Sequence, residues 1–399
     1  MRYKDYNCWC QVLRGPLNDI IVLDNTHVLA GPFAGRLLGE LGAQVIKVEP
    51  PYGEMGRRLG YHWFASVNAN KKFIAINLKD DEGKKILYEL VKKSDVFLTN
   101  YKYSTVIKLG LSYEDLKKVN PKIIYLQLTG FGTEGPYKDV PAHDIILQSL
   151  SGMAYTNGFP DDPPIRCGPP VIDVVAGLCS ALSIVAALYH REKSGEGQFI
   201  DIALYDAAIM LMIEHLAYYF MGYPERLGNA NPMQTVYNIF KAKDGYVAVV
   251  TGEDAQWNAL LKIMGREDLK ADPRFKTLPE RSKHRTIIDE IVESWTKNIF
   301  LKDAEKLMTS VDFPIAPVRH LESILNDPQV KERQMIVKLP HPVLNEVVTP
   351  GSCMKLSKTP GKVESPGYPI GYHTEEILKS LLGYEDDRIK ALKEKGIIV

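Results

Sequence analysis

The stretch Ile20-Ile21-Val22-Leu23-Asp24, followed by Pro32 to Leu41 and then by Val45 to Glu49, decides the fold of this chain. The first and last segments are apolar and have the length of buried strands. The middle segment opens with Gly31-Pro32 and closes at Gly42, which is typical of a helix. A helix that links two strands in this way makes them parallel neighbours. The sequence therefore predicts that the fold begins with a parallel β-α-β unit.

The same alternation continues to about residue 203. The further predicted strands are Phe73 to Leu78, Asp95 to Thr99, Lys122 to Leu128 and Phe199 to Ala203, and helices are predicted at Asp81 to Lys93 and Tyr113 to Val119. This pattern indicates an α/β protein with a Rossmann-like, doubly wound sheet, whose ligands bind beyond the carboxyl ends of the strands. The turn after the first strand lacks a G-x-G-x-x-G fingerprint, and no P-loop motif appears in the sequence.

With 399 residues the chain is long enough for two domains. We expect a large α/β domain that begins at 16–223, a linker at 224–235 and a small α+β domain at 236–325, which contains a hairpin around Lys243-Asp244-Gly245. Residues 326–399 are expected to be a linker and a return to the large domain. The large domain is then built from both ends of the chain, with the small domain inserted.

The composition excludes several classes of partner. There are 49 Lys and Arg against 49 Asp and Glu, a balance that argues against a nucleic-acid-binding protein. The longest apolar run, Val174 to Tyr189, is short of a membrane span, and no signal peptide is recognised, so we expect a cytoplasmic protein without a membrane partner. The five scattered cysteines are expected to be reduced, and Cys8-x-Cys10 lacks the second half of a zinc site, so no metal is expected.

Asp173 is the most informative single residue. It is the one charge between Gly168 and Gly177, directly before the apolar run Val174 to Tyr189, which predicts a buried helix. A carboxylate in that position must be paired, capping or reactive, because burial of an unpaired charge is very costly. Two interpretations stay open from the pattern alone: Asp173 caps the helix, or it is an ionised nucleophile at a helix N-terminus.

Several short motifs, taken in order, resemble the family III CoA-transferases of the CaiB/BaiF type, which include formyl-CoA:oxalate and carnitine CoA-transferases and share a fold with the α-methylacyl-CoA racemases. The resemblance covers about residues 16–399. The motifs that carry it are Val22-Leu23-Asp24 with Ala30-Gly31-Pro32, Leu41-Gly42-Ala43-x-Val45-Ile46-Lys47-Val48-Glu49, Asn70-Lys71-Lys72, Asp95-Val96 with Asn100-Tyr101, the Asp173 segment with Lys193-x-Gly195-x-Gly197-Gln198, and Gly371-x-His373-Thr374-Glu375.

The resemblance implies an enzyme that transfers coenzyme A between an acyl-CoA and a free carboxylic acid. Asp173 would be the nucleophile, forming an aspartyl anhydride and then an aspartyl-CoA thioester. CoA would be a substrate, with no tightly bound cofactor, and the enzyme would be an interlocked homodimer. By the same resemblance the CoA-binding positions are Val28, Asn100, Tyr101 and Lys108, with Lys71 or Lys72 as candidates for contact with phosphate.

Two other functions stay open. The pair His143-Asp144 resembles the H-D pair with which the racemases move the α-proton of a 2-methylacyl-CoA, and His is the usual proton carrier at neutral pH. Alternatively His143 packs and Asp144 satisfies loop amides, and the segment Pro164 to Asp173 favours a transferase. A non-catalytic CoA-binding protein is the third interpretation. Leu29 stands where formyl-CoA transferases have Gln, which argues against oxalate-like substrates.

Overall fold

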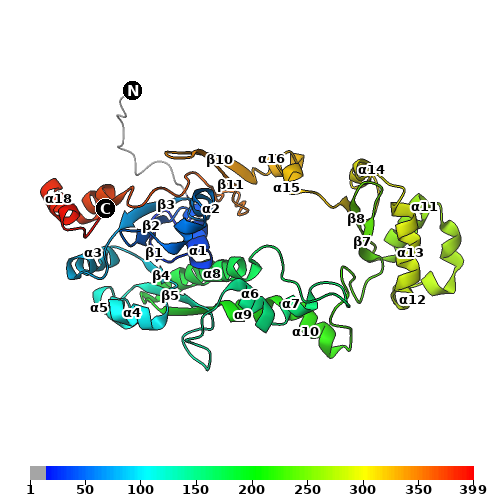
Figure 1. The fold of residues 1–399 in the computed structure, drawn as a ribbon, viewed down its shortest axis with the longest axis horizontal. Coiled ribbons are helices and arrows are strands. Elements are labelled where there is room, and N and C mark those ends of the chain that lie inside the picture. Colours follow the sequence, from blue (N-terminus) through cyan, green and yellow to red (C-terminus); the bar gives the residue numbers. More distant parts are fainter. Residues whose placement is uncertain (1–14) are drawn as a thin grey trace. The chain divides into compact units, whose positions relative to one another are not determined.

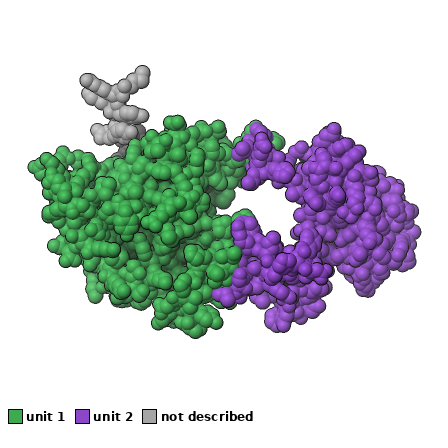
Figure 2. All heavy atoms as spheres, in the orientation of Figure 1, with its two compact units in different colours: residues 1–147, 169–210, 328–399 green, residues 148–168, 211–327 purple. Residues whose placement is uncertain are grey.

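The computed structural model describes residues 15–399 (Figure 1), so Cys8 and Cys10 lie outside the described residues. The chain forms two compact units, coloured separately in Figure 2. The first takes in the chain up to residue 147 together with 169–210 and 328–399, and the second consists of 148–168 and 211–327. Residues 148–168 and 211–223, expected in the larger domain, thus group with the second unit.

A six-stranded sheet is the centre of the first unit (Figure 1). Its strands are β1 (Ile21–Asn25), β2 (Gln44–Glu49), β3 (Lys71–Ala75), β4 (Val96–Thr99), β5 (Ile124–Thr129) and β6 (Phe199–Ala203). Their order across the sheet is β3-β2-β1-β4-β5-β6, and all neighbours are parallel. This is the order of a doubly wound sheet, in which the chain reverses direction between β1 and β4 and leaves a crevice at their carboxyl ends.

Helices cover both faces of this sheet because side chains alternate along each strand. Leu23 and Ile46 point into a core shared with α3 (Asp81–Lys92), α5 (Tyr113–Val119) and α17 (Thr374–Leu382). Asp24 points to the opposite face, where it lies against Gly35 of α1 (Ala30–Glu40). Glycine is needed there, because a Cβ at Gly35 would come within 2.6 Å of the Asp24 carboxylate.

The longest helix, α8 (Val171–Ser194), is longer than the predicted run because it continues through the polar turn His190 to Ser194. By length and composition alone it could span a membrane. In the first unit it packs instead against α1, β5 and β6 and buries Ile172, Ala176 and Ile184. We therefore regard α8 as a core helix of this unit.

The second unit has a core of its own. Its strands β7 (Tyr237–Lys241), β8 (Tyr246–Val250) and β9 (Ile315–Pro317) form an antiparallel sheet, and the predicted hairpin is the β7-β8 pair. Trp257, Leu260 and Ile288 are buried against it. The helices of this unit are α7 (Met153–Thr156), α10 (Ile213–Phe220), α11 (Asp254–Met264), α12 (Leu278–Lys283), α13 (Arg285–Thr296), α14 (Leu301–Leu307) and α15 (Leu321–Ile324).

The remaining elements complete the first unit and the boundaries. Two strands, β10 (Ile336–His341) and β11 (Asn345–Pro350), pair as an antiparallel hairpin. The other helices are α2 (Tyr61–Val67), α4 (Tyr103–Leu109), α6 (Asp144–Leu150), α9 (Leu204–Leu211), α16 (Pro328–Glu332) and α18 (Asp386–Glu394).

Candidate active site

The loop after β1 and the loop after β4 meet at the carboxyl edge of the sheet. Asn100, the first residue after β4, accepts a hydrogen bond from His27 N at 2.8 Å and donates one to His27 O at 2.8 Å. The amide of Asn100 thus pairs with the backbone of His27 as a neighbouring strand would. Of the predicted CoA-binding residues, the structure brings Val28, Asn100 and Tyr101 together here, and it uses the Asn100 amide to hold the loop.

Val28 adopts a strained backbone conformation in this loop. Its φ is +66°, in the left-handed region, which is a clear outlier for a β-branched residue. Such a conformation costs about 1–3 kcal/mol and persists only where the surroundings enforce it. Val28 N donates to Glu54 Oε2 at 3.1 Å, and Glu54 is 5% exposed. Strain of this kind is typical of a binding or catalytic loop, and no sequence pattern indicated it.

Three charged side chains are buried beneath the start of α1. Asp24 Oδ2 accepts a hydrogen bond from Lys71 Nζ at 2.7 Å, and Lys47 Nζ lies 3.5 Å from Asp24 Oδ1. Burial raises the pKa of Asp24, but attraction to Lys47 and Lys71 and hydrogen bonds from Lys71 and Thr26 outweigh it, so the net pKa is lowered. Burial lowers the pKa of Lys71 to about 8. At neutral pH two ammonium groups thus face one carboxylate.

Lys71 is a structural residue. Besides Asp24, its Nζ donates to Pro32 O at 2.7 Å and to Asn68 Oδ1 at 2.8 Å, which uses all three of its donors. The side chain is also fully buried. The predicted contact between Lys71 and a CoA phosphate is therefore corrected: the ammonium group is committed to holding α1 and β1 together.

The other predicted cations lie apart from Lys71. Lys72 is half-buried and forms an ion pair with Glu376 at 2.6 Å. Lys108 is exposed in the last turn of α4. Lys71 and Lys72 open β3, at the amino edge of the sheet, whereas the exposed Lys79 follows its carboxyl end. Strand direction therefore makes Lys79, which we did not single out from the sequence, a better phosphate candidate than Lys72.

Buried polar atoms without a partner gather at the same edge. Tyr101 follows Asn100, and its ring centre lies 5.0 Å from that of His27. Burial raises the pKa of Tyr101 to about 12, so its phenol stays neutral and can donate. Among the residues that the structure describes, the buried side-chain atoms at the strand ends that lack a hydrogen-bond partner are Asn25 Oδ1, His27 Nδ1, Glu54 Oε1 and Thr129 Oγ1.

Asp173 lies in the first turn of α8, and Asp144 caps that helix. The N-cap residue is Pro170. The Asp144 carboxylate, contributed by α6, accepts hydrogen bonds from Ile172 N at 2.9 Å and from Asp173 N at 3.4 Å. The interpretation of Asp173 as the helix cap is therefore wrong. Asp144 was expected to satisfy loop amides, and its carboxylate instead accepts from amides in the first turn of α8. The Asp173 side chain is left for another role.

The pKa of Asp173 is raised to about 7, by burial and by repulsion from Asp144. A helix N-terminus favours a carboxylate by only about 0.3–1 kcal/mol. A shift from 3.8 to about 7 corresponds to roughly 4 kcal/mol at about 1.4 kcal/mol per pH unit. Burial and repulsion therefore dominate over the helix dipole. The interpretation of Asp173 as a carboxylate that is ionised at neutral pH is revised accordingly, because the raised pKa brings its titration close to neutrality.

Close packing of α1 on α8 brings Asp173 towards the β1 loop. A Cβ at Gly177 would lie 2.8 Å from Ala30 O, so only glycine allows this approach. Residues four apart share one face of a helix. Asp173 therefore lies on the face of α8 that meets the start of α1. Helix α1 begins at Ala30, two residues after Val28. The sequence separates Val28 and Asp173 by 145 positions, and helix packing joins them.

His143 lies directly before α6 and is exposed. Its backbone carbonyl accepts from Ile146 N at 2.9 Å and from Leu147 N at 3.2 Å. The prediction that His143 packs is therefore wrong. Its neighbour Asp144 is buried, with its carboxylate on the α8 amides.

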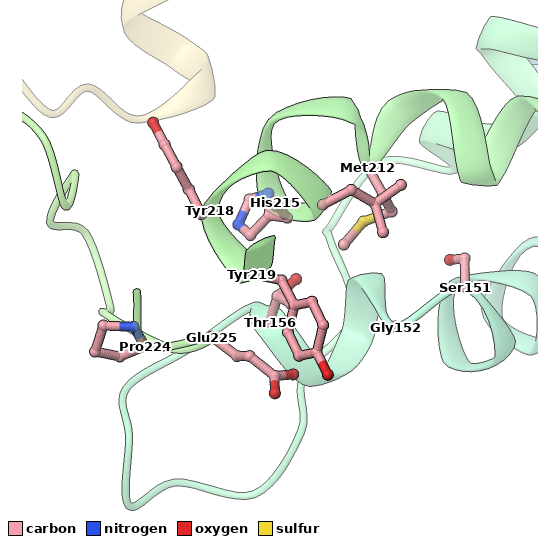
Figure 3. A pocket seen from close by; sticks show the side chains of 10 residues that line it. Ser151, Gly152, Thr156, Met212, His215, Tyr218, Tyr219, Pro224 and Glu225 are labelled. Atoms are coloured by element: carbon pink, nitrogen blue, oxygen red, sulfur yellow. The ribbon is translucent and has the colours of Figure 1, made fainter. Parts of the chain in front are cut away.

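The structure also contains a pocket of about 240 Å³ in the second unit (Figure 3). It contains none of the predicted site residues. Its lining residues come from α7, α10 and their loops: Ser151, Gly152, Thr156, Met212, His215, Leu216, Tyr218, Tyr219, Pro224 and Glu225. Across residues 15–399 no group of three or more His, Cys, Asp or Glu side chains could hold a metal ion. The chemistry points to the sheet edge and not to this pocket.

Comparison with known proteins identifies the family. A model of CoA-transferase family III matches residues 17–374. This chain belongs to CoA-transferase family III. The CoA-transferase is 35% identical over 394 residues to succinyl-CoA--D-citramalate CoA-transferase of Chloroflexus aurantiacus, covering 96% of this chain and 98% of that protein. It is 33% identical over 393 residues to succinyl-CoA:glutarate CoA-transferase of Homo sapiens, covering 96% and 90%.

The fold leads to the same family. A crystal structure of a CaiB/BaiF family protein from Brucella suis matches this CoA-transferase with a TM-score of 0.83 and 31% identity, covering 92% of this chain and 99% of that one. The predicted family and the prediction of an enzyme with CoA-transferase activity are confirmed. Coenzyme A is accordingly a substrate of the family.

Proposed function

We propose that this enzyme moves CoA from succinyl-CoA, or another short dicarboxylic acyl-CoA, to a second short carboxylic acid through covalent intermediates on Asp173. The names of the two relatives above support the donor, because both contain succinyl-CoA. The observation that carries the mechanism is the position of Asp173 at the start of α8, on the face that meets α1, where burial and repulsion from Asp144 raise its pKa to about 7. Val28 and Tyr101, with Lys79 and Lys108, would hold CoA at the sheet edge.

The first half of the reaction leaves CoA on the enzyme. A carboxylate oxygen of Asp173 attacks the thioester carbonyl carbon of the donor, and the C–S bond breaks to release CoA thiolate and an aspartyl-acyl anhydride. The thiolate then attacks the Asp173 carbonyl carbon of the anhydride. This step releases the donor acid as its carboxylate and leaves an aspartyl-CoA thioester, so no proton is gained or lost.

The second half reverses these steps with the acceptor. The acceptor carboxylate attacks the aspartyl-CoA carbonyl carbon and expels CoA thiolate, which gives a second anhydride. The thiolate attacks the acceptor carbonyl of that anhydride, forms the new acyl-CoA and restores the Asp173 carboxylate. Thioester energy is kept throughout, and ATP is not required.

Each attack creates an oxyanion, which needs hydrogen-bond donors that are already in place. The α1 N-terminus supplies backbone N–H groups, because its N-cap Leu29 has no side-chain hydrogen bond. Ala30 approaches α8 one turn after Asp173. Burial and repulsion from Asp144, which raise the Asp173 pKa, also make the ionised carboxylate a stronger nucleophile than an ordinary aspartate.

We further propose that the enzyme is an interlocked, cytoplasmic homodimer. Large apolar side chains on two helices support association: in α10, Ile213 is 75% and Phe220 83% exposed, and in α8 Leu182 is 71% exposed. Patches of this kind mark interaction surfaces. A folded monomer that forms simply on dilution, detected by analytical ultracentrifugation, would contradict the interlocked dimer.

The donor and acceptor are tested with a panel of acyl-CoAs and free acids, following CoA esters by mass spectrometry. We expect transfer from succinyl-CoA to short carboxylic acids. Hydroxylamine added during turnover should modify Asp173, which peptide mapping would show. Modification of another residue would move the nucleophile, and binding of CoA without any transfer would favour the non-catalytic alternative.

A further inference from the structure

Side chains from four neighbouring elements hold the backbone of the β1 loop. Asp24 Oδ1 accepts from Thr26 N at 3.0 Å, and Lys47 Nζ donates to Thr26 O at 2.5 Å. Asn100 holds both backbone groups of His27, as described above. The next residue, Val28, is the strained one, and its N–H donates to Glu54. From Thr26 to Val28 the loop is therefore fixed by its surroundings and not by its own conformational preference.

Glu54 is itself anchored from behind. Its Oε2 also accepts from Gly56 N at 2.5 Å, and its backbone N–H donates to Glu49 Oε1 at 3.2 Å. Glu49 forms a two-bond ion pair with Arg57, at 2.8 and 2.6 Å. The Arg57 guanidinium lies 3.9 Å from the centre of the Phe64 ring. The carboxylate of Glu54 is thus held by the loop after β2 and reaches across to the loop after β1.

We infer that Glu54 is a positioning residue for CoA transfer. It keeps Val28 in the left-handed conformation and so sets where the chain enters α1, next to Asp173. Val28 precedes Leu29, the N-cap of α1, and Ala30, whose carbonyl oxygen lies against Gly177. A Val28 that relaxed to negative φ would turn this segment away from the α8 face that carries Asp173. The inference rests on the proposed role of the loop and of Asp173.

A double-mutant cycle between Glu54 and Val28 tests this role. Glycine adopts positive φ at no steric cost, so Val28→Gly should keep the loop in place without the bond to Glu54. In the parent, Glu54→Ala should lower kcat/KM by at least about tenfold, whereas in the Val28→Gly background the same change should cost less than about threefold. Glu54→Gln retains an acceptor oxygen, so its kcat/KM should fall by less than about threefold.

The matched control is Asp115→Ala. The Asp115 carboxylate also accepts a backbone N–H, from Ser112 at 3.3 Å, but it lies in the first turn of α5, as part of the capping box of that helix. The substitution Asp115→Ala should lower the melting temperature and leave kcat/KM within about twofold of the parent value. If Glu54→Ala does not fold, Glu54→Asp, which shortens the reach to Val28, takes its place in the cycle.

The outcomes separate this inference from the proposed mechanism. The dissociation constant of free CoA, measured by calorimetry in every variant, does not depend on covalent chemistry at Asp173. We expect this dissociation constant to be higher in Glu54→Ala than in the parent. In the double variant it should stay close to that of Val28→Gly. If Glu54→Ala lowers kcat/KM equally in the parent and in Val28→Gly, or does not lower it at all, the positioning role is overturned. Hydroxylamine modification away from Asp173 would overturn the mechanism and leave the cycle interpretable.

Discussion

Asp24 and Asp173 are aspartates of the same unit, and their surroundings give them opposite properties. Asp24 lies between Lys47 and Lys71, whose attraction outweighs burial and lowers its pKa. Asp173 faces Asp144, and burial together with repulsion raises its pKa to about 7. One carboxylate is neutralised by cationic partners within the fold, while the other is the proposed nucleophile. The residue type is the same, so the neighbours decide the role.

The largest expected effect tests the reactive side of this comparison. Asp173→Ala should lower the rate of CoA transfer by at least about 10⁴-fold, because it removes the covalent centre. Circular dichroism and CoA affinity should stay close to the parent, since Asp144 and not Asp173 caps α8. Activity within tenfold of the parent would rule out Asp173 as the nucleophile.

The structural side is tested by Asp24→Asn. This change leaves two buried ammonium groups without their anion, and we expect the free energy of unfolding to fall by about 3–5 kcal/mol in urea titrations at pH 7. The control is Asp81→Asn, which removes an exposed partner of Lys84 at 3.7 Å. This control should change the free energy of unfolding by less than about 0.5 kcal/mol. Equal small effects of the two substitutions would show that the buried cluster does not hold the fold.

A substitution at His143 tests whether the enzyme exchanges acyl groups through Asp173 or moves the α-proton of its substrate, as a racemase does. His143→Gln should lower transfer by about 10- to 100-fold at most, through substrate placement, which is less than for a general base in the rate-limiting step. In deuterated water a 2-methylacyl-CoA should keep its α-proton, as mass spectrometry would show. Rapid α-deuteration that depends on His143, without acyl exchange, would favour the racemase.

The smallest expected effect concerns the repulsion between Asp144 and Asp173. The nucleophile is the carboxylate, and its pKa is raised to about 7, so kcat/KM should rise with pH and level off above about 7. Asp144→Asn removes the like charge but keeps an acceptor for Ile172 N. The half-maximal pH should therefore fall, by about one unit. An unchanged profile would mean that Asp144 does not tune Asp173.

Much of the first unit was predictable from local pattern. The run Ile20 to Asp24 became β1, the segment Tyr113 to Val119 is α5, and Phe199 to Ala203 is β6, because buried parallel strands and the helices between them have distinct periods. The extent of α8 was underestimated, since its last turn is polar and an apolar run cannot reveal it. The choice of Lys71 as a phosphate ligand failed because burial is not visible in a sequence.

The sequence by itself determined the order of strands and helices, the family, and the isolated position of Asp173 before an apolar helix. These are properties of neighbouring residues and of short motifs, which local periodicity and composition record. Only the tertiary structure decided that Asn100 holds His27, that Glu54 holds Val28, and that burial together with the nearby Asp144 raises the pKa of Asp173. Each of these contacts joins residues 26 to 73 positions apart, and it forms because strand order and helix packing bring distant loops to one edge of the sheet.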